Sequence, residues 1–171
     1  MPTVTVPDYV PAQNYVSVFF LPTIASQAAP TVAEFTAGVD ITPFLPVDWA
    51  GITGDQAKGS QTRMALPESF EILGRITRSI SEFVYTYLPQ AAGSDPANKV
   101  YTAMAAGSAG YIAVRYGVPT STSIAATQKV ESIKVITGVQ NKQTTGTDEF
   151  APLTVTQSVS AQAVPVAGVV A

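Results

Sequence analysis

The side chains that could carry chemistry are few, and most of them are carboxylates. The sequence contains no histidine and no cysteine, which removes the commonest general base, the commonest metal ligand, and thiol nucleophiles. The acidic residues in groupings worth testing are Glu68, Glu71, Glu82, Asp148 and Glu149. Paired carboxylates can hydrolyse glycosides, but only at a fixed separation across a cleft that holds a sugar. Because nothing places the single tryptophan, Trp49, beside them, we interpret them as solvated loop charges.

A glycine-containing stretch from Gly54 to Ser60 has a partial likeness to a phosphate-binding loop. Its Lys58 precedes Gly59, whereas the lysine of a P-loop follows the glycine, and no buried strand leads into the stretch. A Ser-His-Asp triad is excluded, and a cation site built from three oxygens has no support in the spacing. We therefore predict no catalytic, cofactor or metal site and expect the protein not to be an enzyme.

The composition indicates one domain with few surface charges. At 171 residues the chain can bury one core, and only 12% of its residues are charged, about half the usual share. A formal charge of -3 leaves little repulsion between copies, so we expect partner subunits to cover much of the surface. We predict a single domain over 1–171, with an N-terminal arm (1–14), a long loop (47–66) and a C-terminal arm (161–171).

The uncharged segment 150–171 is the candidate for a membrane span, and it fails. Pro152, Pro165 and several Gln and Ser residues interrupt the apolar run that a lipid-crossing helix needs. The start of the chain lacks the basic residues of a signal peptide. Since no basic cluster occurs either, we predict no membrane contact and no sequence-specific binding of nucleic acid.

Alternating apolar residues predict four strands, over 15–21, 110–116, 129–139 and 153–160. The first has apolar side chains on both faces, so both faces need cover. In the second, Ile112, Val114 and Tyr116 are expected on one side and Arg115 on the other. The third places Ile133, Val135 and Val139 opposite a solvated face with Ser132 and Lys134. The last two strands have similar lengths and can pair as a hairpin with a long loop.

Two helix starts carry capping signals. Thr31 and Glu34 have the spacing of a capping box, and Gly38 can end that helix in a left-handed cap, although a plain turn is the alternative. Asp95 and Pro96 provide an N-cap and a first helical residue. An apolar stripe then predicts a helix to Ala106, which packs on a sheet and stops at Gly107: Ala97, Val100, Tyr101 and Met104.

The stretch from Ser69 to Leu88 reads as a long strand region with a bend or bulge at Gly74. Beyond Gly74 one face alternates apolar with charged residues, and the other changes from hydroxyls to aromatics. A strand that leaves its own core and enters a shared sheet would show this pattern. With helix 96–106 and strand 110–116 it forms a β-α-β core, which we interpret as a building block for self-assembly.

Three stretches in this order resemble a known family: Thr31 to Leu45, Asp95 to Met104, and Gly110 to Gly117. The sequence resembles the major tail (tail tube) proteins of long-tailed bacteriophages, in order from Val16 to Ser160. The resemblance implies a mainly β, α+β fold: a β-sandwich or barrel with one flanking helix that contributes strands to an inter-subunit β-barrel. It also implies six copies per ring, rings stacked into a tube, and no cofactor.

The resemblance further implies which residues and partners serve assembly. The family uses a long early loop for ring-to-ring contact, which gives as stacking candidates Asp48, Trp49, Asp55, Lys58 and Arg63. Acids facing the lumen would repel DNA, which gives as lumen candidates Glu68, Glu71 and Glu82, followed by Asp148 and Glu149, unless Arg75 and Arg78 pair with them. Partners would be further copies, tape measure, tail terminator and distal tail proteins, and double-stranded DNA in transit.

On this interpretation the protein is made in the host bacterial cytoplasm and resides in the virion tail. Two other functions stay open from the sequence. One is another ring-forming tail component, a terminator or a head-tail joining protein, which would stop at one ring. The other is a monomeric β-sandwich that binds a carbohydrate or cell-surface ligand through exposed aromatics such as Trp49, Tyr85 and Tyr87.

Overall fold

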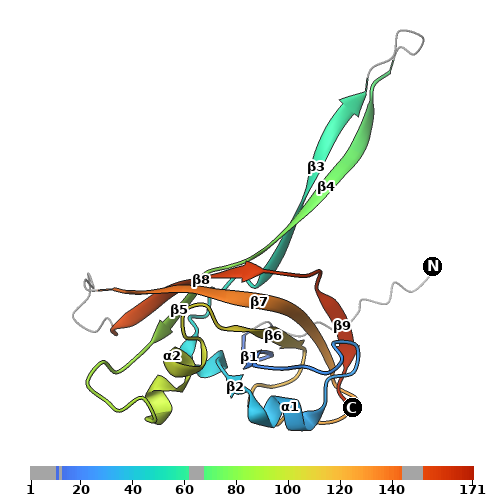
Figure 1. The fold of residues 1–171 in the computed structure, drawn as a ribbon. Coiled ribbons are helices and arrows are strands. Elements are labelled where there is room, and N and C mark those ends of the chain that lie inside the picture. The colour runs from blue at the N-terminus through green and yellow to red at the C-terminus, as the bar shows by residue number, and fades with distance from the viewer. Residues whose placement is uncertain (1–10, 12, 62–67, 144–151) are drawn as a thin grey trace, which may run out of the picture.

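The chain folds into a body built around one curled antiparallel sheet, from which a two-stranded arm projects (Figure 1). The structure is a computed structural model and describes residues 11, 13–61, 68–143 and 152–171. The predicted mainly β fold with a short flanking helix is confirmed. Of the N-terminal arm predicted over 1–14, residues 1–10 and 12 lie outside the described part. No helix in the described ranges is long and apolar enough to cross a membrane.

The described residues form nine strands and four short helical segments. The strands are β1 (Val16–Leu21), β2 (Val39–Asp40), β3 (Ile52–Gln61), β4 (Phe70–Ile80), β5 (Phe83–Thr86), β6 (Ala109–Tyr116), β7 (Lys129–Lys142), β8 (Thr154–Ala161) and β9 (Val166–Val169). The helical segments are α1 (Val32–Ala37), α2 (Lys99–Ala103), and the 3-10 turns η1 (Thr42–Phe44) and η2 (Pro96–Asn98).

The main sheet has the order β2-β1-β6-β7-β8-β5, and β9 pairs with the first part of β7. The predicted pairing of strands 129–139 and 153–160 is confirmed, because β7 and β8 are antiparallel neighbours. The C-terminal arm predicted over 161–171 is instead part of this sheet. Residues 129–132 of β7 pair with 166–169 of β9, and Val170 is buried. The prediction failed because the pairing partner of this uncharged segment lies more than thirty residues earlier in the chain.

Buried side chains cover both faces of the sheet. One cluster contains Ile112, Ile133 and Val155 and packs beneath α2. The other includes Phe35 of α1 and Val170 near the C-terminus. The prediction that both faces of strand 15–21 need cover is confirmed, because β1 sends Val18 and Phe20 into the first cluster and Phe19 and Leu21 into the second.

Three predicted side-chain placements change. Tyr116 is 51% exposed because β6 continues beyond its last pair with β7, Val114 opposite Glu131. Val139 is exposed because the β7–β8 register shifts between Thr137 and Gln140, which moves it off the core face. Ser132 is fully buried and accepts hydrogen bonds from the Gln27 side chain. Each change follows from local register or from a distant contact.

The capping box of α1 is confirmed, but Gly38 serves a different purpose from the predicted one. The Glu34 backbone N–H donates to Thr31 Oγ1 at 3.3 Å, and the Thr31 N–H donates to Glu34 Oε2 at 2.7 Å. Backbone hydrogen bonds from Thr31 and Ala25 lower the pKa of Glu34. Gly38 has φ -81° and ψ -173°, so it is not a left-handed cap. A Cβ there would press on the Leu21 side chain and lie 2.8 Å from the Phe20 carbonyl, which explains the glycine by packing.

The helix predicted over 96–106 is shorter and begins as a 3-10 turn. Asp95 Oδ1 accepts the Ala97 N–H at 2.9 Å, as expected for an N-cap. The buried Asn98 side chain accepts the Leu88 N–H at 2.9 Å and donates to the Leu88 carbonyl at 2.8 Å. We infer that this tie to Leu88, two residues after β5, delays the α-helical turns until Lys99.

Replacing Asp95 with alanine should lower the free energy of unfolding by about 1 kcal/mol, because the cap of the Ala97 N–H is lost. Urea denaturation of the unassembled protein measures the change. Asp95→Asn is the matched control, since asparagine also caps and should retain most of the stability. If both variants lose the same free energy of unfolding, the Asp95 carboxylate does not contribute by capping the helix.

The predicted strand region 69–88 divides between two sheets. β4 ends at Ile80 and β5 begins at Phe83, and they pair with β3 and β8 respectively. The bulge expected at Gly74 is confirmed, since the β3–β4 register shifts between Gln56 and Lys58, opposite residues 73–76. The prediction of a long loop over 47–66 is wrong for most of its length, because residues 52–61 form β3. Residues 52–61 have no hydrophobic periodicity that would predict a strand. They form one because their backbone pairs with β4.

Candidate assembly surfaces

The arm formed by β3 and β4 is anchored in the core of the body. Ile80 is buried at its base, and Ile52 packs against the same cluster. The Trp49 ring stacks on Phe83 with centroids 5.0 Å apart, and its Nε1–H donates to the Ser81 carbonyl at 3.4 Å. Trp49 was a ring-stacking candidate, but the structure assigns it to the root of the arm, where it joins the arm to β5.

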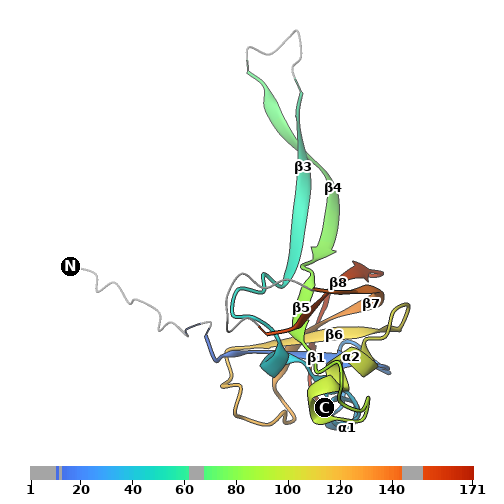
Figure 2. The same cartoon turned by 90° about the vertical axis from the view of Figure 1, so that its left-hand side faces the viewer.

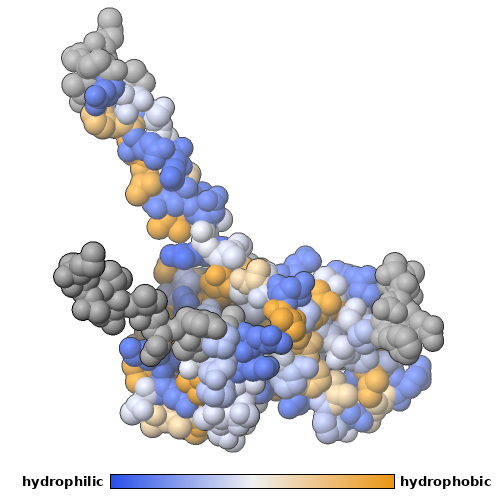
Figure 3. Space-filling view, turned by 180° about the vertical axis from the view of Figure 1, so that it is seen from behind, coloured by the Kyte–Doolittle hydropathy of each residue, from blue (hydrophilic) through white to orange (hydrophobic). Residues whose placement is uncertain are grey.

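Beyond this root the arm stands clear of the body (Figure 2). Four large apolar side chains of β4 are about half exposed or more: Phe70 (55%), Ile72 (49%), Leu73 (61%) and Ile76 (53%). Apolar and polar patches lie next to one another along its length in Figure 3. An isolated two-stranded hairpin is marginal in water. The arm therefore exposes apolar surface that the described part of the chain leaves uncovered.

The bulge at Gly74 distributes these apolar residues over both faces of the arm. Ile76 pairs with Gln56 and Leu73 pairs with Lys58, so these two share the face of β3's even-numbered residues. On the other side of the arm, Ile72 pairs with Gly59 and Phe70 pairs with Gln61. Without the extra residue, Ile72 and Ile76 would share one face. Both faces of the arm consequently offer apolar contacts.

The described charges of the arm balance one another. Its basic residues are Lys58, Arg75 and Arg78, and its acidic residues are Asp55, Glu68 and Glu71. Lys58 Nζ lies 3.7 Å from Glu71 Oε2, with both side chains largely exposed, so this ion pair contributes little to stability. The arm is therefore not an acidic surface, although two of the predicted lumen acids lie on it.

The sequence-predicted site residues occupy three places. Asp55 and Lys58 lie on β3, and Glu68 and Glu71 lie at or near the start of β4. Near the root, Asp48 and Glu82 are exposed. The structure brings Lys58 and Glu71 together and does not gather the acids at one point. The remaining candidates, Arg63, Asp148 and Glu149, lie outside the described residues.

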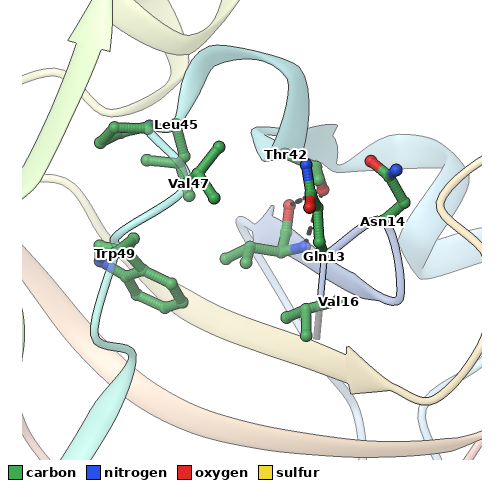
Figure 4. A pocket seen from close by; sticks show the side chains of 9 residues that line it. Gln13, Asn14, Val16, Thr42, Leu45, Val47 and Trp49 are labelled. Atoms are coloured by element: carbon green, nitrogen blue, oxygen red, sulfur yellow. Dashed lines mark hydrogen bonds between the residues drawn. The ribbon is translucent and has the colours of Figure 1, made fainter. Parts of the chain in front are cut away.

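A recess of about 190 Å³ opens beside the root of the arm (Figure 4). It is lined by Gln13, Asn14, Val16, Val18, Thr42, Leu45, Pro46, Val47 and Trp49. The Thr42 hydroxyl accepts the Val18 N–H at 2.8 Å and donates to the Val18 carbonyl at 3.3 Å. Because no ionisable side chain among the described residues lines it, the recess suits an apolar side chain better than acid–base chemistry.

A buried hydrogen-bond network fixes the curled end of the sheet. The Tyr85 hydroxyl donates to Gln157 Oε1 at 3.0 Å and accepts from Gln140 Nε2 at 2.9 Å. Gln157 Nε2 donates to the carbonyls of Met104 and Gly138 at 2.7 and 2.8 Å. Burial raises the pKa of Tyr85 to about 12, against the effect of the Gln140 hydrogen bond. The network joins β5, β7, β8 and α2.

The protein should lose stability as the pH rises from 10 to about 12. In this window Tyr85 stays protonated in the folded state, whereas the unfolded chain, with an ordinary pKa of 10.0, has lost the proton. The unfolded state therefore binds fewer protons, so the free energy of unfolding falls with pH and is fully retained below pH 10. Urea midpoints across this range measure the slope.

The Tyr85→Phe variant is the control for this pH dependence. It should be less stable at neutral pH because Gln157 loses a partner, and its stability should fall less steeply above pH 10. Tyr116, whose pKa is also raised by burial, is unchanged in this variant and accounts for part of the slope that remains. Identical slopes in both proteins would contradict the assignment to Tyr85.

The sequence profile of a family described as phage tail tube protein matches residues 3–171. The chain belongs to the phage tail tube protein family. The resemblance drawn from the three sequence stretches is confirmed, and membership makes the protein a structural component of the virion tail. A comparison with curated proteins finds no match to this tail tube protein.

Among solved structures, a chain in the cryo-EM structure of the anti-feeding prophage (AFP) baseplate, symmetrised sixfold, is similar to this tail tube protein. The alignment covers 98% of this chain and 97% of that chain, with a TM-score of 0.53 and 8% sequence identity. At this identity the likeness concerns the fold. It agrees with the curled, half-barrel sheet of the tail tube protein.

The exposed apolar residues of β4 form a surface that the sequence alone did not reveal. The sequence did hold a sign of this surface, because Ile72 and Ile76 lie on either side of the bulge predicted at Gly74. The strand that pairs with β4 could not be predicted, because residues 52–61 show no alternation of apolar and polar side chains. Assigning Ile72 and Ile76 to opposite faces of the arm required the β3–β4 register.

Proposed function

We propose that this tail tube protein assembles into hexameric rings, and that the rings stack into a tube through which DNA is delivered. One observation carries the proposal: an anchored arm projects from the body with four half-exposed apolar residues, two on each face. When a contact buries the exposed half of one such side chain, it gains about 0.75–1.5 kcal/mol, half of the value for full transfer. A second copy of the chain is the partner that supplies this cover in a homopolymer.

The arm extends away from the body, so it is suited to contacts between successive rings (Figures 1 and 2). The stacking element would then be the β3–β4 hairpin rather than a loop. Asp55 and Lys58 remain stacking candidates on its surface, whereas Trp49 holds its root. The structural neighbour comes from a particle symmetrised sixfold, which supports six copies in the ring.

Contacts within a ring would use the open edge of the sheet at β5. In the sheet order β5 is the outermost strand, next to β8. Open edges promote association with another strand, and closing them into a barrel removes this tendency. Leu88 and Leu153, each about half exposed, flank a recess at the end of this edge that also involves Pro152 and Ala97. We expect an inter-subunit barrel built through this edge, with tape measure, terminator and distal tail proteins at its ends.

Electron microscopy and mass measurement of the purified protein test the proposal. Stacked rings or tubes, and a ring mass of six copies, are the expected results. Particles that stop at a single ring would instead indicate a terminator or head-tail joining component. A monodisperse monomer at high concentration, with no polymer on addition of a tail initiator complex, would contradict the proposal.

Shortening the arm tests its role in stacking. Deleting 55–60 alone would remove the partners of β4 from Glu71 to Thr77. Removing 55–60 together with 71–77 keeps both strands paired at the root, where Ile52 and Ile80 remain. The shortened protein should keep its fold and form single rings. Tubes of normal length would show that the arm is not the stacking element.

A further inference from the structure

The recess beside the root of the arm has the size and lining of a site for one aromatic side chain. Leu45, Val47 and Trp49 lie on one side of it, and Gln13 and Val16 lie on the other (Figure 4). Its volume is about 190 Å³, and a dry apolar cavity of about 150 Å³ is large enough to hold benzene. This recess, which we call the root recess, therefore has room for one phenyl ring.

The walls of the root recess are held in place, and polar groups in them already have partners. The Trp49 ring stacks on Phe83, and its Nε1–H donates to the Ser81 carbonyl. The Thr42 hydroxyl exchanges hydrogen bonds with the backbone N–H and carbonyl of Val18. Since neither group needs a ligand to complete its hydrogen bonds, the walls offer a ligand mainly apolar surface.

The mouth of the root recess leaves apolar surface in water. Val47 is 88% exposed, which is the highest value among the exposed large apolar side chains of the described residues. The exposed side chains of Gln13 and Asn14 lie across the mouth from it (Figure 4). Exposed apolar surface with a polar rim is typical of a site that another protein surface covers.

Phe70 is the exposed side chain of the arm that best fits this recess. It is 55% exposed and lies at the outer end of the arm, where it pairs with Gln61. Among the four exposed apolar side chains of the described arm, it alone has an aromatic ring. Inside the root recess this ring would meet Trp49, and aromatic rings favour such stacked or edge-on contacts.

The Phe70 ring cannot enter the root recess of its own chain. From Ile52 at the root to Gln61 at the outer end, β3 advances about 30 Å, at about 3.3 Å per residue. The arm stands clear of the body over this length (Figure 2). The ring would therefore come from another copy. Because the donating and receiving surfaces differ, the contact is heterologous and can repeat along a stack without closing on itself.

We propose that the root recess receives the Phe70 ring of a copy in the adjacent ring of the stack. This inference rests on the proposed function and names the surface on which the arm docks. The contact buries the exposed half of Phe70 and removes water from Val47 and Trp49. It also gives the stack a direction, because one end is left with unbound arms and the other with empty root recesses.

Trp49 fluorescence tests whether stacking fills the root recess, because Trp49 is the single tryptophan of the chain. The side chain is partly exposed, so acrylamide should quench its emission in the unassembled protein. In tubes of the unsubstituted protein most of this quenching should be lost. Phe70→Ala should raise the concentration needed for stacking by about 3- to 10-fold. Stacks of this variant, assembled above that concentration, should keep the quenching.

Ile76→Ala is the matched control for the fluorescence test. Ile76 is 53% exposed, but it pairs with Gln56 on the opposite face of the arm from Phe70. This variant removes a similar exposed apolar area and leaves the phenyl ring in place. Its stacks should therefore protect Trp49 from acrylamide as well as the unsubstituted stacks do.

Each outcome of the fluorescence test decides between occupants of the recess. Quenching that persists in unsubstituted tubes would show that the root recess stays open. Protection before assembly would show that a segment of the same copy fills it, and protection in Phe70→Ala stacks would show that another group does. Any of these results overturns the inference and leaves the tube intact. If the unsubstituted protein forms no rings or tubes, the proposed function fails as well.

Cross-linking identifies the two surfaces that meet. The chain has no cysteine, so Gln61→Cys places one thiol beside Phe70, and Val47→Cys places one at the mouth of the root recess. In tubes of the double variant, a short bis-maleimide should join many copies into covalent chains on a denaturing gel. Tubes mixed from the two single variants should give covalent pairs only. Tubes of either single variant alone should give no cross-link, and a cross-link there without one in the mixture would contradict the contact.

Discussion

Replacing both Phe70 and Ile72 with aspartate should leave a folded protein that no longer forms tubes. The two side chains share one face of the arm and are 55% and 49% exposed, so the body loses little packing. Because about half of each side chain is already buried, completing its burial in a contact contributes about 0.75–1.5 kcal/mol, half of the value for full transfer. Losing both should raise the concentration needed for stacking by about 10- to 10²-fold. Thermal unfolding measures the fold, and sedimentation with electron microscopy measures the tubes.

Gln61→Asp is the matched control, because Gln61 pairs with Phe70 on the same face and carries no apolar surface. It adds negative charge to the arm while leaving both apolar side chains in place, and it should reduce tube yield only slightly. Normal tubes from the Phe70 and Ile72 variant would rule out this face as a stacking contact. If Gln61→Asp also abolishes the tubes, the loss of tubes in the Phe70 and Ile72 variant is due to the added charge and not to the missing apolar side chains.

Replacing Arg115 with alanine should lower the free energy of unfolding by about 3–5 kcal/mol. The guanidinium is only 1% exposed and donates to Ser17 Oγ at 3.0 Å. It also holds the connector after β6 through the carbonyls of Pro119, Thr122 and Ser123 and through Gln128 Oε1. Burial lowers the pKa of Arg115. Alanine would leave a cavity and would take the donor away from the buried Ser17 hydroxyl and from the carbonyls of the connector.

Two further substitutions separate the contributions of Arg115. Arg115→Lys keeps the charge but lacks the planar fork that reaches several acceptors, so it should still cost much of the stability. Arg115→Met keeps most of the volume without any donor. Urea denaturation of the unassembled variants gives the three free energies. Wild-type stability in the methionine variant would show that filling space, and not hydrogen bonding, is what the side chain contributes.

Local chemistry made several elements of the fold predictable. The Thr31 capping box, the Asp95 N-cap and the Gly74 bulge each depend on residues within a few positions, and each is present. Strands β1, β6, β7 and β8 were also found, because alternation of apolar residues has a period of two wherever one face is buried. The family resemblance depended on the order of these elements.

The candidate site was predicted less well, and the reason is also physical. The segment that we propose for stacking was taken for a loop because Thr53 to Gln61 has no apolar period. Its acids were assigned to a lumen, although Glu71 pairs with Lys58 on the arm. Charge pattern shows which residues are solvated. It does not show which surface of an assembly they face.

The sequence by itself determined that this is a mainly β protein with capped short helices and the element order of a tail tube protein. Only the tertiary structure decided that 52–61 is a strand, that 166–169 joins the sheet, and that Arg115 is buried. Strand pairing and burial depend on partners far away in the chain, as between β7 and β9. Local residue propensities do not identify those partners, so the pairing could be seen only in the folded structure.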